Sequence, residues 1–163
     1  MAKITLAFCK ARYNFMDDII RWWTKSKYTH VELIMPDGDW LSLRHGNMWM
    51  KRKSPLKIMA IPRDCINPRI WDTISIEVTE EQLKSIRLFF KETSGAGYDW
   101  VGMILSHVMR IKIKLRSMWY CSEWVMQALK IAGILNWKET LKYEMSSVSP
   151  GELYTLCKKE KND

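Results

Sequence analysis

The sequence predicts a single α+β domain whose mainly antiparallel sheet packs against helices. Three observations lead to this fold class. Strand patterns and a hairpin signal dominate the first half of the chain, amphipathic helical patterns fill much of the second half, and no repeat or linker interrupts them. Of the 163 residues, 47% are hydrophobic, which is enough for one core. We expect residues 1–157 to form the domain and residues 158–163 to form a charged tail.

The first half of the chain contains mostly strands. We expect a strand at 4–9, a helix at 15–25, a hairpin from the runs 28–35 and 40–45, and further extended segments at 48–52, 56–61 and 71–78, with a loop at 62–68. Asn14 is placed to cap the helix. The hairpin signal is Pro36-Asp37-Gly38-Asp39, and a two-residue Asp37-Gly38 loop would pair Pro36 with Asp39.

The second half is mainly helical. We expect helices at 80–93, 99–109 and 117–132, a basic alternating segment at 110–116, and a short last helix that begins at Pro150. Thr79 and Gln82 form a capping box before the first of these helices. Gly95 and Gly97 end that helix, and Gly133 ends the third one. Proline suits the first position of the last helix because its missing N–H would be unpaired there in any case.

Composition limits the classes of function. No apolar run resembles a signal peptide or a membrane span, so we expect a cytoplasmic protein. The net charge of +8 favours an anionic surface partner, a membrane or a nucleic acid, reached through a basic face, although it is also consistent with solubility alone. No C-x-x-C pair, P-loop or dinucleotide motif is present, so no metal or cofactor is expected.

Cys121 differs from the other three cysteines in its neighbours. Cys9 and Cys157 lie in apolar periodic segments, where a thiol behaves as a small core residue. Cys121 lies in Trp119-Tyr120-Cys121-Ser122, near the expected start of a helix. Unpaired N–H groups and the helix dipole favour a thiolate there and can stabilise an oxyanion. Cys121 is therefore a candidate nucleophile.

His30 is the candidate base. It lies in the expected strand 28–35, where alternation places it on the same face as Glu32. With the two-residue hairpin loop, His30 lies opposite His45, and cross-strand partners share a face. His45 and Glu32 are therefore both candidates to orient the imidazole. A three-residue loop would shift the register and favour Glu32.

These motifs together resemble one family. Thr29-His30-Val31-Glu32-Leu33, Gly97-Tyr98-Asp99-Trp100, Trp119 to Glu123 and Ser149 to Leu153 are similar to the permuted papain-fold family. That family is related to NlpC-type peptidases, YiiX-like amidases and lecithin:retinol acyltransferase-like enzymes. The resemblance implies a permuted papain-like fold in which Cys121 is the nucleophile and His30 the base.

The resemblance also suggests a pocket and a reaction. It implies that Tyr98 lines the pocket near the nucleophile, and we expect Trp119, Tyr120 and Ser122 to contact the substrate. Family members act on amide or ester bonds, so we expect a cysteine hydrolase, either an amidase or peptidase or a lipid acyl-hydrolase or acyltransferase, that works through a thioester. The substrate is a peptide-like or lipid acyl group. The alternative is a catalytically inactive papain-like scaffold that serves as a basic binding module for nucleic acid or a protein.

Overall fold

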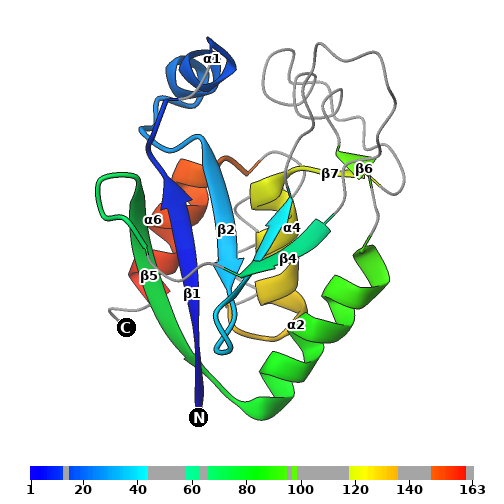
Figure 1. Cartoon of the computed structure of the whole chain (residues 1–163). Helices are drawn as coiled ribbons and strands as arrows, with labels where there is room; N and C mark the ends of the chain where they lie inside the picture. The colour runs from blue at the N-terminus through cyan, green and yellow to red at the C-terminus, as the bar shows by residue number, and fades with distance from the viewer. Residues whose placement is uncertain are drawn as a thin grey trace.

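A computed structural model describes residues 1–12, 15–43, 58–62, 66–94, 97–98, 118–135 and 148–160. Its strands are β1 (Ala2–Cys9), β2 (His30–Ile34), β3 (Asp39–Leu43), β4 (Ile58–Pro62), β5 (Trp71–Val78), β6 (Gly97–Tyr98) and β7 (Met118–Trp119). Its helices are α1 (Phe15–Thr24), α2 (Glu80–Thr93), α4 (Cys121–Ile131) and α6 (Pro150–Glu160). Figure 1 shows their arrangement.

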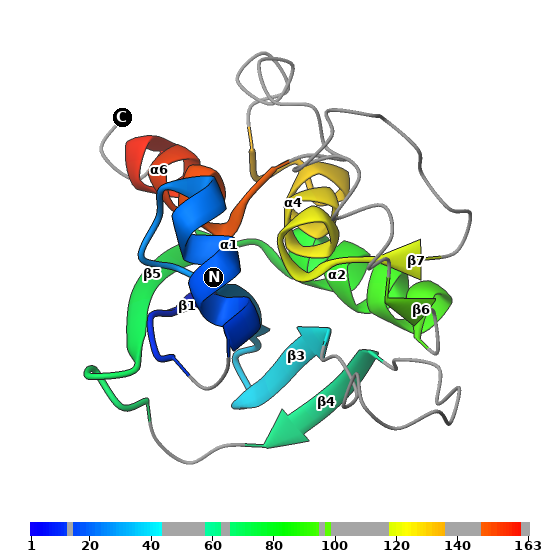
Figure 2. The ribbon, with the colours of Figure 1, turned by 90° about the horizontal axis from the view of Figure 1, so that it is seen from above.

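The main sheet has five strands in the order β4-β3-β2-β1-β5. Every neighbouring pair in it is antiparallel. Helices α4 and α6 contact strands of this sheet, and α2 packs against α4. Seen from above, α2, α4 and α6 lie on one side of the sheet (Figure 2). The prediction of an α+β domain with a mainly antiparallel sheet is confirmed.

The core lies between the sheet and these helices. Alternation along β1 turns Ile4, Leu6 and Phe8 toward the helices, and all three are fully buried. Val31 and Leu33 of β2 join the same cluster, as expected for side chains that share a face. A smaller cluster with Trp40 and Trp71, whose rings are 5.2 Å apart, covers the opposite face of the sheet. The middle strands are therefore buried on both faces.

The hairpin between β2 and β3 differs from the prediction. Ile34 is opposite Trp40, and the Met35 N–H donates to the Asp39 carbonyl at 2.8 Å. Three residues therefore form the loop, and Gly38 supplies the positive φ of 89° that such a loop requires at this position. The predicted pairing of Pro36 with Asp39 is wrong by one residue. The argument that set His30 opposite His45 fails with it.

The ends of the helices follow local chemistry. The capping box of Thr79 and Gln82 is present, and α2 spans the predicted residues. Gly133 has a φ of 64° just after α4, and Pro150 opens α6. Helix α6 extends through Glu160, so residues 158–160, which we expected in a charged tail, belong to the last turn of a helix.

Several predictions lie outside the described residues. They are the Asn14 cap, the extended segment at 48–52, the turn at Gly95, the helix at 99–109 and the basic segment at 110–116. No helix in the described ranges is long and apolar enough to span a bilayer.

The start of α6 lies against the segment that leads into β2. A Cβ atom added to Gly151 would lie 2.3 Å from the Ser26 Oγ and 2.6 Å from the Ser26 Cβ. Atoms cannot approach so closely, so this contact needs glycine. The same Ser26 Oγ accepts a hydrogen bond from the Tyr28 N–H. Helix α6 therefore supports the backbone that precedes His30.

We predict that Gly151→Ala lowers the free energy of unfolding by about 1–3 kcal/mol, the usual cost of overpacking. Ser26→Gly removes the clash, so the double variant should lose less stability than the two single variants added together. Urea unfolding of the four proteins in this cycle measures the coupling. If the stability losses of the two single variants add up, within error, to that of the double variant, the two residues do not touch.

Candidate active site

Cys121 is the first residue of α4. The preceding residues are extended: Met118 and Trp119 pair in parallel with Gly97 and Tyr98, and Tyr120 is the N-cap residue with φ −114° and ψ 164°. This pairing explains why the helix begins at 121 rather than at 117. The prediction that Cys121 lies in the first helical turn is confirmed. Its thiol lies where the helix presents unpaired N–H groups.

The backbone around the sulfur supplies hydrogen-bond donors. The N–H groups of Val31 and Ser122 both donate to the Cys121 sulfur. One donor comes from β2 and the other from the first turn of α4. Cys121 is 4% exposed, so these donors act away from bulk water. They favour the thiolate form over the neutral thiol.

His30 is the first residue of β2. Strand β2 and helix α4 begin at the same end of the molecule, the upper end in Figure 1. The two side chains interact directly, through a hydrogen bond and through the attraction between their charges. The imidazole is 23% exposed. The structure thus brings together the two residues that the sequence proposed as nucleophile and base.

The contact changes the pKa of both groups. Burial by itself favours the neutral form of each. The Cys121 sulfur and the Glu32 carboxylate outweigh this and raise the pKa of His30 to about 10. The attraction of His30, with the two backbone donors, likewise outweighs burial and lowers the pKa of the Cys121 thiol. Between these two pKa values the favoured state is a thiolate beside an imidazolium.

Glu32 is the polar residue beside the imidazole. Its side chain is fully buried, and its Oε1 is 3.3 Å from the His30 Nε2. Within the described ranges, no acceptor makes an aligned hydrogen bond to Nε2, so the contact is an ion pair of the protonated ring rather than a well-directed hydrogen bond. Of the two candidate orienting residues, Glu32 is the one seen beside the ring. His45 lies outside the described residues.

The residues that we expected to contact the substrate or line its pocket have different surroundings. The Ser122 hydroxyl is fully buried and donates to the Val148 carbonyl at 2.7 Å. Its backbone N–H, rather than its hydroxyl, therefore faces the site. Tyr120 is 3% exposed and belongs to the core. The backbones of Tyr98 and Trp119 are paired directly before α4, while their side chains lie outside the described part.

One neighbour of the site was missed by the sequence reasoning. Cys9, the last residue of β1, is the register partner of His30, and the charge of His30 acts on its thiol. Burial nevertheless raises the pKa of Cys9, so this thiol stays protonated where Cys121 does not. The pairing of the first two expected strands would have revealed the contact, had their register been worked out.

The wider comparisons add no relative. No family model matches the sequence, and the searches of curated proteins and of solved structures found no match. Across the described ranges, no three His, Cys, Asp or Glu side chains are grouped as metal ligands would be.

We predict that Cys121 is the most reactive described thiol and that its reactivity depends on His30. Its labelling by iodoacetamide should have a midpoint below the ordinary thiol pKa of about 8.5. His30→Ala removes the charge that stabilises the thiolate, so the midpoint should move to higher pH. Peptide mass spectrometry identifies the labelled site, and Cys9 and Cys157 serve as internal controls. Faster labelling of either control, or an unchanged midpoint in His30→Ala, would refute the pairing.

Proposed function

We propose that this protein is a cysteine hydrolase or acyltransferase of the permuted papain-like type, with Cys121 as nucleophile and His30 as base. The observation that carries the proposal is the direct contact between the Cys121 thiol, at the start of a buried helix, and the His30 imidazole, at the start of a strand. Both pKa shifts favour the charged pair. A thiolate that is ready to react needs no further base to activate it.

The order of the elements supports the architecture. The histidine comes before the cysteine in the chain, on a strand of an antiparallel sheet against which the cysteine helix packs. This is the reverse of the order in ordinary papain-like enzymes and agrees with the permuted group that the sequence motifs resemble. Tyr98 pairs with the strand that leads to Cys121, which is consistent with the pocket position that the resemblance implies.

The geometry supports a two-step acyl transfer. The Cys121 thiolate attacks the carbonyl carbon of an amide or ester, and the carbonyl oxygen becomes an oxyanion near the N-terminus of α4. The imidazolium of His30 then gives its proton to the departing amine or alcohol, and a thioester remains on Cys121. In the second step neutral His30 takes a proton from water or from an acceptor alcohol or amine, which attacks the thioester and frees the thiolate.

The two ring nitrogens of His30 have separate tasks in this scheme. Nε2 is the atom beside Glu32, so we assign the proton transfer at the sulfur to Nδ1. The buried carboxylate of Glu32 stabilises the imidazolium and holds the plane of the ring. Glu32 acts through His30 and is a positioning residue.

We predict that Cys121→Ala abolishes acyl-enzyme formation. The probe is an activated acyl ester such as p-nitrophenyl acetate, and intact mass spectrometry detects the added acyl group. Wild type should gain one acetyl group at Cys121. The control variant Cys157→Ala removes a buried thiol that is far from His30 in the sequence, and it should also gain one acetyl group at Cys121. If Cys121→Ala is acetylated as fast as wild type, the nucleophile is elsewhere. If wild type is not acetylated but binds anionic polymers, the inactive binding scaffold becomes the better explanation.

We predict that Glu32→Gln lowers the upper pH limit of acylation. The pKa of His30 is about 10 because the Cys121 sulfur and Glu32 outweigh burial, so in wild type the imidazolium persists until the pH rises through that value. Loss of the Glu32 charge lowers the pKa of His30, and the ion pair is then lost at lower pH. The rate at neutral pH should fall on the order of tenfold or more. A reduced rate with an unmoved alkaline limb would indicate a purely structural role for Glu32.

A further inference from the structure

Helix α1 presents an apolar stripe whose two large aromatic side chains are mostly exposed to solvent. Phe15, Ile19 and Trp22 follow the i, i+4, i+7 spacing of one helix face. Phe15 and Trp22 are each 76% exposed, and neither Ile19 nor Ile20 is buried. A surface helix normally turns such a face to the core. Here no described side chain of α1 is buried.

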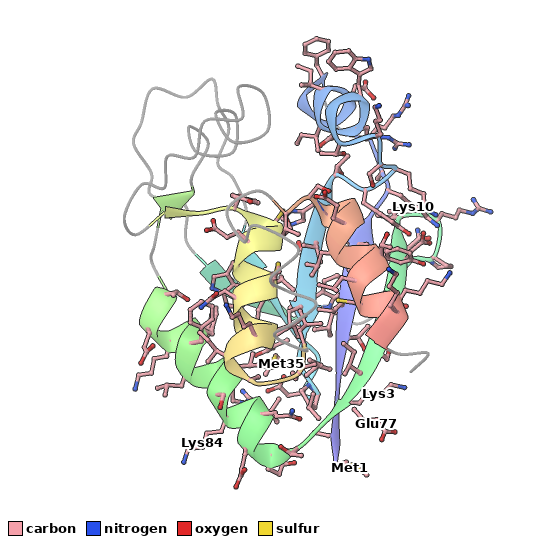
Figure 3. The ribbon with its side chains drawn as sticks, turned by 180° about the vertical axis from the view of Figure 1, so that it is seen from behind. Met1, Lys3, Lys10, Met35, Glu77 and Lys84 are labelled. Carbon is pink, nitrogen blue, oxygen red and sulfur yellow. The ribbon has the colours of Figure 1, made fainter. Side chains whose placement is uncertain are left out.

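A hydrogen bond and an ion pair join described residues of α1 to the segment that follows β1. The Arg21 Nη1 donates to the Lys10 carbonyl, at the end of β1, with a length of 3.1 Å. The Arg12 Nε lies 3.2 Å from the Asp18 Oδ1. In Figure 3, Lys10 lies at the base of α1, and side chains of the helix project away from the molecule. These contacts tie α1 to the end of β1, while Phe15 and Trp22 remain exposed.

The charge around α1 indicates what covers the stripe. Residues 10–27 include five basic and two acidic side chains. Asp18 is paired with Arg12, and Lys10 and Lys27 both pair with Asp72 of β5. Even with Asp72 included, basic side chains outnumber acidic ones here, so this region is net positive and complementary to an anionic surface. Aromatic residues on one face of a short helix with basic residues around it are typical of helices that lie in a membrane interface. Tryptophan in particular favours that region of a bilayer.

The position of α1 connects this surface to the site. The helix lies between the end of β1 and the start of β2 in the chain, that is, between Cys9 and His30, which are register partners. Figure 1 shows it above the end of the molecule where β2 and α4 begin. A surface on which α1 rests is thus on the same side as Cys121.

We propose that α1 docks the protein on the surface of an anionic lipid bilayer, with Phe15 and Trp22 inserted among the headgroups. The docking itself does not depend on catalysis. In combination with the proposed function, on which this second part rests, it directs the Cys121–His30 pair toward ester or amide bonds of lipids in the bilayer interface rather than toward soluble peptides.

The test is co-sedimentation of the full chain with phosphatidylcholine vesicles that contain or lack phosphatidylglycerol. We use the Cys121→Ala background, so that binding is measured without turnover. The protein should sediment with the anionic vesicles, and added salt should weaken the association. Phe15→Ser/Trp22→Ser should bind at least about tenfold more weakly, because it removes two large apolar side chains from the interface.

Matched controls come from exposed apolar residues elsewhere. Leu88→Ser/Ile131→Ser changes side chains that are 55% and 47% exposed on α2 and α4, and it should bind like the parent. Thermal unfolding checks that each variant folds, and Trp22→Ser alone gives a milder test if the double variant does not. The proposal is overturned if the parent does not bind anionic vesicles, or if the α1 and control variants bind them equally well. It is also overturned if sedimentation velocity shows a dimer that Trp22→Ser dissociates, because a second copy would then cover the stripe.

Loss of binding in the α1 variants, together with unchanged acetylation of their Cys121-containing forms, supports docking separately from chemistry. Failure of acetylation in wild type with intact vesicle binding would leave the docking in place and remove only the proposed enzyme. Membrane docking and the proposed enzyme activity are therefore refuted by different measurements.

Discussion

The packing of α4 against the sheet is the constraint on which the candidate site depends. Eight of the eleven residues in this helix are buried, and the helix contacts β2, β3, α2 and α6. The helix cannot rotate or slide without opening the core, because protein interiors are close-packed. Its first residue is therefore held at one place relative to β2. That rigidity lets a thiol and an imidazole from distant parts of the chain meet.

The same packing raises the free-energy cost of keeping the Cys121–His30 pair charged. Charges buried among apolar side chains lose hydration, and the loss is tolerable only where other charges and hydrogen bonds replace the water. Here the sulfur has two backbone donors and an imidazolium, and the imidazolium has a second anionic partner, the Glu32 carboxylate. Each group compensates another, so removal of one member should affect the whole set rather than one contact.

Much of this arrangement could be predicted from local sequence signals. The capping box at Thr79 and the extended segment at 71–78 depend on neighbouring residues, and both were placed correctly. The meeting of Cys121 with His30 was also expected, from the residue types around each. The hairpin register was not, because two- and three-residue loops fit the same Pro-Asp-Gly sequence and only the packing of Ile34 and Trp40 decides between them. The start of α4 was missed for a related reason: the β6–β7 pairing that keeps 118–119 extended leaves no local signal.

The separation of the paired residues along the chain has a consequence for biosynthesis. During synthesis His30 emerges from the ribosome before Cys121, and both strands that pair with β1, β2 and β5, precede the last two helices in the chain. Until α4 is complete and seated, the thiol has neither its imidazolium nor its second backbone donor. The nascent chain thus carries an ordinary cysteine, and the pKa of its thiol falls only when the tertiary structure forms. Under the proposed function, folding itself is the step that activates the thiol.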